Sequence, residues 1–161
     1  MSNIKELING KDSILVFDVD GVLALLEFGK YRHYDLDDDE WNKVVSDGLN
    51  FYTEDKVSKK MQKFLKDKDM KKIYVITTVG CENEAKYKKQ YLNKYYNILY
   101  DNIYFVDHDK DKVSKLNKIK ELNPDIDDYK IVMIEDTVKI LNDVMDNTNY
   151  STAHISSFLD I

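Results

Sequence analysis

The stretch ILVFDVDGVL, residues 14–23, decides the fold of this chain. Its apolar residues 14–17 run directly into two carboxylates, Asp18 and Asp20, and Gly21 follows them. An unbroken apolar run of this kind is typical of a strand that is buried on both faces of a sheet. Because side chains two residues apart lie on the same side of an extended backbone, the two aspartates are expected to point the same way. Two like charges at the end of a buried strand are unfavourable unless a cation or a proton compensates them.

The length and composition predict a soluble protein of one domain. The chain has 161 residues with a hydrophobic content of 43%, which fits a globular domain spanning residues 1–161. Its formal net charge of −6 argues against non-specific binding to long polyanions, although a local basic groove stays open. Neither a membrane-length apolar run nor a signal peptide is found, so no membrane partner is expected. Cys81 is the only cysteine, which excludes an internal disulfide and fits a cytoplasmic location.

Apolar runs alternate with helical stretches along the chain. Besides the strand at 13–19, strands are expected at 73–78, 103–106, 131–134 and 152–156. Helices are expected at 54–66, 82–96, 112–122 and 138–145, with Thr53 as the N-cap of the first, and shorter helices within 1–11 and after Asp35. This alternation predicts a three-layer α/β/α Rossmann-like fold with a mostly parallel central sheet of about five strands. In such folds, ligands bind outside the carboxyl ends of the strands.

Polar residues stand where the predicted strands end. The first strand ends in Asp18 and Asp20, the second in Thr77 and Thr78, and the fourth in Glu135 and Asp136, while a helix beginning at Lys112 follows the third. If the sheet is parallel, all of these residues converge on one edge of it.

This order of motifs resembles the haloacid dehalogenase-like (HAD) superfamily of phosphohydrolases, from about residue 13 to residue 143. Asp18 and Asp20 match its first motif in full, an Asp-x-Asp pair after an apolar strand. The other motifs are a Ser or Thr ending a strand, a single lysine, and acidic residues after a later strand. Thr77 and Thr78 compete for the second motif. Lys110 and Lys115 compete with Lys112 for the third, although the spacing from Leu116 favours Lys112.

The fourth motif departs from the common pattern of the family. A second acid often follows four or five residues after the first, and those positions are Ile140 and Leu141 here. The Glu135-Asp136 pair therefore resembles a family variant, with Asp136 as a metal ligand and Glu135 as a direct or water-mediated helper.

The resemblance implies magnesium-dependent hydrolysis of a phosphomonoester. Asp18 would attack phosphorus and form an aspartyl-phosphate, and Asp20 would be the acid that protonates the leaving alkoxide and the base that activates water. Thr77 and Lys112 would hold the phosphoryl oxygens. Gly21 would let the chain turn beneath the phosphate, with Thr78 as a second binding residue. The implied Mg²⁺ ligands are Asp18, Asp136, Glu135 and the main-chain carbonyl of Asp20.

Two alternative functions stay open at this stage. One is a catalytically silent binding or regulatory module that keeps the fold and a metal, against which the presence of Asp20 argues. The other is phosphotransfer to an alcohol rather than hydrolysis.

The spacing of the motifs predicts a protein without a large cap domain. Only a short segment separates the third strand from Lys112, so the remaining room lies at 24–53, which we expect to form a flap or small insert. Within it, Arg32 in the run Tyr31–Tyr34 is a candidate to stack on a base or to pair with a second phosphate, while an exposed loop is the alternative. Capless family members tend to act on macromolecular ends or to borrow a lid from a neighbouring subunit. A nucleotide or nucleic-acid end is therefore preferred among phosphorylated substrates, and a homo-oligomer stays open.

Overall fold

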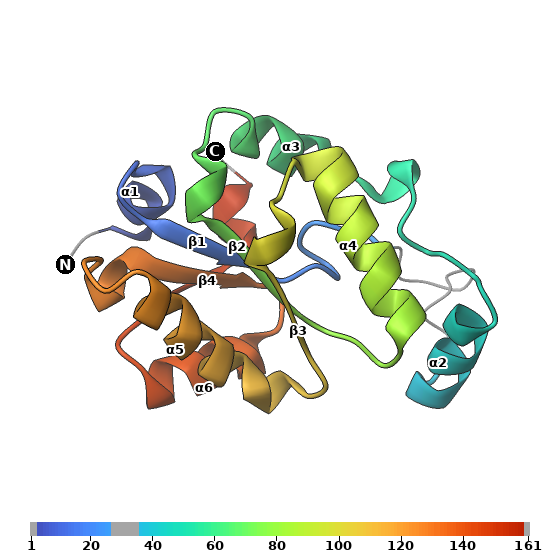
Figure 1. Cartoon of the computed structure of the whole chain (residues 1–161). Helices are drawn as coiled ribbons and strands as arrows, with labels where there is room; N and C mark the ends of the chain where they lie inside the picture. Colours follow the sequence, from blue (N-terminus) through green and yellow to red (C-terminus); the bar gives the residue numbers. More distant parts are fainter. Residues whose placement is uncertain (1–2, 27–35, 160–161) are drawn as a thin grey trace.

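A parallel five-stranded sheet forms the centre of the protein (Figure 1). The computed structural model describes residues 3–26 and 36–159. The strands are β1 Ile14–Phe17, β2 Ile73–Thr78, β3 Ile103–Val106, β4 Ile131–Glu135 and β5 Ser151–His154. Their order in the sheet is β3-β2-β1-β4-β5, and every neighbouring pair is parallel. The stretch that decides the fold is thus the central strand.

Helices cover both faces of this sheet. The α-helices of the described residues are α1 Ile4–Asn9, α2 Asp38–Ser46, α3 Lys59–Leu65, α4 Glu82–Tyr96, α5 Lys112–Leu122 and α6 Val138–Asn147. Helices α1, α3 and α4 lie on one face, and α5 and α6 on the other (Figure 1). Helix α2 packs against α4 beyond the edge of the sheet.

The central strand contributes to two hydrophobic cores at once. Leu15 and Phe17 belong to the core under α1, α3 and α4, whereas Ile14 and Val16 belong to the core under α5 and α6. All four side chains are at most 1% exposed. Because successive strand residues point to opposite faces, only an uninterrupted apolar run satisfies both cores.

The predicted three-layer α/β/α fold is confirmed, and the sheet is wholly parallel. The residue bounds predicted for β2, α4, β3 and α5 are those observed. No cap stands between β3 and α5, which are joined by residues 107–111. Within the two described segments, no helix combines the length and the apolar character needed to cross a bilayer.

The prediction of one helix over residues 54–66 is wrong. Glu54–Lys56 is a short 3-10 helix, and α3 begins only at Lys59, where the Ser58 side chain accepts a hydrogen bond from the Met61 amide at 3.3 Å. Thr53 makes no such cap. The reason is tertiary, because Val57 pairs with Ala24 in an isolated antiparallel bridge and cannot be helical. This bridge ties the segment that follows β1 to the chain entering α3.

Candidate active site

A cavity of about 250 Å³ lies at the carboxyl ends of β1, β2 and β4. The described residues that line it are Asp18, Asp20, Thr77, Thr78, Asp109, Lys112, Glu135, Asp136, Thr137 and Ile140. They come from segments far apart in the sequence, and the parallel sheet brings them to one edge as predicted. Every sequence-predicted site residue except Gly21 and Arg32 lines this cavity. Arg32, together with the rest of the Tyr31–Tyr34 run, falls outside the described residues.

Asp18, Lys112 and Glu135 form a buried ion cluster at the base of the cavity. The Lys112 ammonium donates to Asp18 Oδ1 at 3.1 Å and to Glu135 Oε2 at 2.8 Å. All three side chains are at most 10% exposed. Of the three candidate lysines, Lys112 is therefore the one whose ammonium contacts Asp18, while Lys110 is exposed to solvent.

The electrostatics of the cluster show an excess of negative charge. Burial raises the pKa of Asp18 despite the attraction of Lys112, and the charge of Asp20 raises it further. Burial, followed by the charge of Asp18, likewise raises the pKa of Glu135. Burial lowers the pKa of Lys112, but the two carboxylates outweigh this effect and raise it above its usual range. The single positive charge of Lys112 thus does not neutralise all of the surrounding carboxylates, and a bound cation would compensate the remaining negative charge.

The acidic residues fit a divalent metal ion. Asp18, Glu135 and Asp136 each offer a carboxylate oxygen, and these atoms lie within 4.8 Å of one another. Glu135 already accepts from Lys112 and from the amides of Asp136 and Thr137, at 3.1 and 3.3 Å. Among the described residues, the Oδ2 atoms of Asp18 and Asp136 accept no hydrogen bond. Oxygen donors of this kind suit Mg²⁺, which is usually bound through one or two carboxylates plus waters.

Asp136 has a close neighbour at its main-chain carbonyl and another at its side chain. The Nε2 atom of His154, at the end of β5, lies 3.0 Å from the Asp136 carbonyl oxygen. The other ring nitrogen accepts from the Ser156 amide at 3.2 Å, so Nε2 carries the hydrogen and donates. Next to its side chain, Gly21 has a φ of +78°, and a Cβ there would clash with Asp136 Oδ2. Gly21 is therefore required both by its backbone conformation and by the closeness of the carboxylate.

Gly21→Ala is expected to displace the Asp136 carboxylate. Gly48→Ala is the matched control, because Gly48 also has a positive φ, +105°, but a Cβ there meets nothing within 4 Å. The left-handed backbone alone costs a non-glycine residue about 1–2 kcal/mol. Urea unfolding should show a loss of this size for Gly48→Ala and a larger one for Gly21→Ala. If the carboxylates bind Mg²⁺, its addition should raise Tm by less in Gly21→Ala than in Gly48→Ala, and equal behaviour of both variants would contradict the contact with Asp136.

The two candidate threonines have different surroundings. Thr77 is fully buried, and its Oγ1 accepts a hydrogen bond from Lys88 at 3.0 Å. Thr78 donates its hydroxyl to Asp109 at 2.6 Å. The Thr77 hydroxyl donates only a long hydrogen bond, 3.5 Å, to the Thr78 carbonyl. Since the Thr78 hydrogen is held more closely, Thr77 is the better candidate to donate to a ligand in the cavity.

Sequence reasoning missed three residues that surround Asp20. Lys88 and Glu84 lie one turn apart on α4, and Tyr52 comes from the loop before α3. The Lys88 ammonium lies 2.7 Å from Asp20 Oδ2 and 3.0 Å from Glu84 Oε1. The available signal was helical spacing, because Glu84 and Lys88 fall on the same stripe as Tyr91 and Tyr95. That stripe faces the core, so its two charged members are buried.

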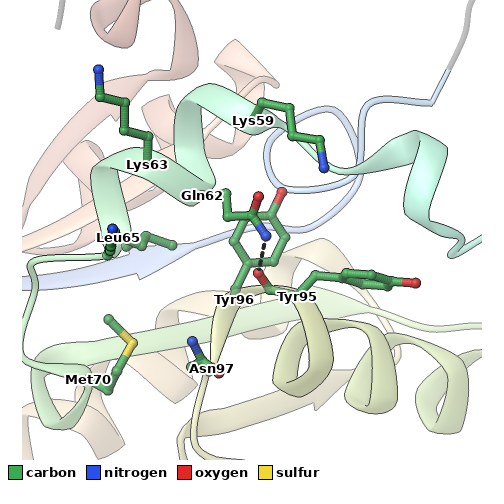
Figure 2. Close-up of a pocket in the computed structure, with 9 residues that line it drawn as sticks. Lys59, Gln62, Lys63, Leu65, Met70, Tyr95, Tyr96 and Asn97 are labelled. Atoms are coloured by element: carbon green, nitrogen blue, oxygen red, sulfur yellow. Dashed lines mark hydrogen bonds between the residues drawn. The ribbon is translucent and has the colours of Figure 1, made fainter.

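Two further cavities differ in their relation to this site. One of about 400 Å³ shares Asp20 and Thr78 with the first cavity and extends to Trp41, Asn42 and His108. Another of about 350 Å³ lies between α3 and the end of α4, where Gln62 donates to the Tyr95 carbonyl at 2.8 Å (Figure 2). It shares none of the described residues that line the carboxylate cavity, and its lysines are exposed on the surface of α3 and just after it.

Comparison with known proteins gives a likeness in structure. No protein-family model matches this chain, and no curated protein matches its sequence. The structure of DsGPDH of Dunaliella salina matches over 96% of this chain, with a TM-score of 0.59 and 12% sequence identity. The two proteins share a fold. This chain spans 25% of the length of DsGPDH, so the likeness concerns one part of that protein. At 12% sequence identity, the match shows a similar fold and nothing about function.

HAD domains are among the similar solved structures. Two structures of the HAD domain of the effector protein Lem4 from Legionella pneumophila, one of them an inactive mutant, have TM-scores of 0.49 and 0.48. Their sequence identities are 13% and 14%, and each match covers 89% of this chain and 84% of that one.

Proposed function

We propose that this protein is a magnesium-dependent phosphomonoesterase of the HAD type. The observation that carries the proposal is the buried Asp18–Lys112–Glu135 cluster beside Asp136, at the carboxyl edge of a parallel sheet. Asp20 and Thr77 line the same cavity, so each role in the chemistry has a side chain available.

The acidic residues would hold Mg²⁺ through Asp18, Asp136 and the main-chain carbonyl of Asp20, with Glu135 as a helper. When bound, Mg²⁺ neutralises charge on the phosphoryl oxygens and on the surrounding carboxylates. Without that neutralisation, the carboxylates would repel a phosphate dianion.

Asp18 is the nucleophile of the proposed reaction. One of its carboxylate oxygens attacks phosphorus and the other remains available to Mg²⁺, because Oδ1 keeps a lone pair beside the one that accepts from Lys112. As the bond from phosphorus to the ester oxygen breaks, Asp20, which enters this step as the carboxylic acid, gives its proton to the leaving alkoxide. Asp20 then takes a proton from the water that attacks the aspartyl-phosphate, which releases inorganic phosphate and restores Asp18. Thr77 and Lys112 donate to the oxygens of the transferring group.

The leaving group of the substrate is assigned to the adjoining cavity of about 400 Å³. This cavity shares Asp20 with the catalytic one, and a general acid must face the leaving oxygen. Trp41, stacked on Phe51 with ring centroids 4.3 Å apart, contributes an aromatic surface to its lining. An aromatic side chain beside polar groups favours a nucleotide or a nucleic-acid end over a sugar phosphate.

Phosphate release from p-nitrophenyl phosphate tests the proposal. We expect release in the presence of Mg²⁺ and a loss of at least about 100-fold with a chelator, because general acid catalysis and charge neutralisation each contribute factors of this order. A panel of nucleotides, 3′-phosphorylated oligonucleotides and sugar phosphates then ranks the substrates. Binding of Mg²⁺ without turnover of any of them would contradict the proposal and favour a silent binding module. Transfer to an added alcohol in place of hydrolysis would favour a phosphotransferase.

A further inference from the structure

Lys88 is a lysine buried in the interior of the protein. Its side chain is 0% exposed in the middle of α4. Burying an ammonium is unfavourable unless it is paired and hydrogen-bonded. Four acceptors surround its three hydrogens: Asp20 Oδ2 at 2.7 Å, Glu84 Oε1 and Thr77 Oγ1 at 3.0 Å, and the Thr78 carbonyl at 2.6 Å. Lys88 thus contacts three residues that line the carboxylate cavity, namely Asp20, Thr77 and Thr78.

Tyr52 is a second residue that contacts the Asp20 carboxylate. Its hydroxyl lies 3.0 Å from Asp20 Oδ1 and 3.2 Å from Glu84 Oε1. Each carboxylate oxygen of Asp20 therefore has a separate donor, Tyr52 on Oδ1 and Lys88 on Oδ2. Two donors from different elements fix both the position and the plane of a carboxylate, which a single donor cannot do.

Carboxylates surround both donors. Burial lowers the pKa of Lys88, but Asp20, Glu84 and Asp18 outweigh this effect and raise it. Burial and the charges of Asp20 and Glu84 raise the pKa of Tyr52 well above its usual value. The single hydrogen of the Tyr52 hydroxyl has its shorter contact to Asp20, at 3.0 Å against 3.2 Å to Glu84.

We infer that Lys88 and Tyr52 are positioning residues that hold Asp20 toward the oxygen of the leaving group, an inference that rests on the proposed function. The Asp20 side chain is 31% exposed and lines both cavities. Each carboxylate oxygen has two lone pairs, so Asp20 keeps acceptor capacity for the proton that it transfers. Lys88 also donates to Thr77 Oγ1, which directs the hydrogen of that hydroxyl away from Lys88. Lys88 thereby links the acid to the phosphate-binding threonine.

The test compares two substrates that differ in their need for an acid. The leaving group of phenyl phosphate is basic and requires protonation, whereas that of 2,4-dinitrophenyl phosphate departs without it. For Lys88→Met, we expect kcat/KM on phenyl phosphate to fall about 100-fold and on the dinitrophenyl ester less than about 10-fold. The comparison uses kcat/KM because it reports formation of the aspartyl-phosphate, whereas kcat also includes its hydrolysis, in which Asp20 acts on both esters alike. Tyr52→Phe should show the same selectivity with a smaller loss. Asp20→Asn removes the acid itself and so shows the largest loss expected from misplacing it. Lys86→Met changes an exposed lysine of the same helix and should match the wild type.

The outcomes separate the inference from the proposed function. A wild-type protein that hydrolyses neither ester would refute the proposed function itself. A wild type active on both, with variants that lose equal factors on the two esters, would refute only the positioning role. Lys88→Met leaves buried carboxylates unpaired, so circular dichroism must accompany its kinetics. If it does not fold, Tyr52→Phe decides the question, because that variant removes a hydroxyl and retains Lys88.

Discussion

Asp18→Asn is expected to reduce turnover by about 10⁴–10⁶-fold, as the removal of an attacking side chain does in other enzymes with covalent intermediates. Asparagine has the shape of aspartate, but its amide cannot displace the leaving group and form an acyl-phosphate. The measurement is Mg²⁺-dependent phosphate release from p-nitrophenyl phosphate, with the amount of folded protein matched by circular dichroism.

The fold of this variant should survive. Asp18 is buried near Asp20 and Glu135, and burial already raises its pKa, so its negative charge does not favour the folded state. A neutral amide there removes repulsion, and Tm without metal should stay equal or rise. Asp12→Asn is the matched control, because Asp12 precedes the other end of β1 and its side chain is 86% exposed. An Asp18→Asn variant that retains the wild-type rate would eliminate Asp18 as the nucleophile.

Lys112→Met is expected to show the largest loss of stability. Methionine fills a similar volume but leaves Asp18 and Glu135 buried without the ammonium that now lies 3.1 and 2.8 Å from them. Removing one partner of a buried ion pair costs about 3–5 kcal/mol. Urea unfolding in the presence of a chelator measures this change directly. Turnover should fall as well, because Lys112 donates to the transferring group in the proposed mechanism.

The effect of Mg²⁺ on Tm is the more specific measurement for this variant. With the ammonium gone, a divalent cation becomes the remaining source of positive charge beside the two carboxylates, so Mg²⁺ should raise the Tm of Lys112→Met more than that of the wild type. Lys110→Met, at an exposed position just before α5, should change stability by less than about 0.5 kcal/mol. A Lys112→Met protein as stable as the wild type would contradict the charged cluster.

Much of the fold follows from local sequence patterns. The apolar runs of β1, β2, β3 and β4 and the helical spacing of α4 and α5 are properties of short segments, and their predicted positions hold. The position of the carboxylate cavity follows from one more rule, because parallel strands bring their carboxyl ends to the same edge. This rule alone predicts that Asp18, Thr77 and Glu135 lie close together, although they come from three separate segments.

Other features depend on contacts between distant segments. The start of α3 lies at Lys59 because Val57 pairs with Ala24, which no pattern within residues 54–66 reveals. Lys112 was distinguished from its neighbours by spacing alone, and its contact with Asp18 depends on how α5 packs against the sheet.

The chain by itself determined the alternation of strands and helices and the acidic end of its central strand, since both are written in periodicity and residue order. Only the tertiary structure decided what surrounds Asp20. Lys88 is one lysine in a lysine-rich chain, and its burial depends on the rotation of α4 about its axis and on the path that brings Tyr52 against the same carboxylate. The physical reason is that a buried charge is stabilised by its partners, and those partners become neighbours only when the chain has folded.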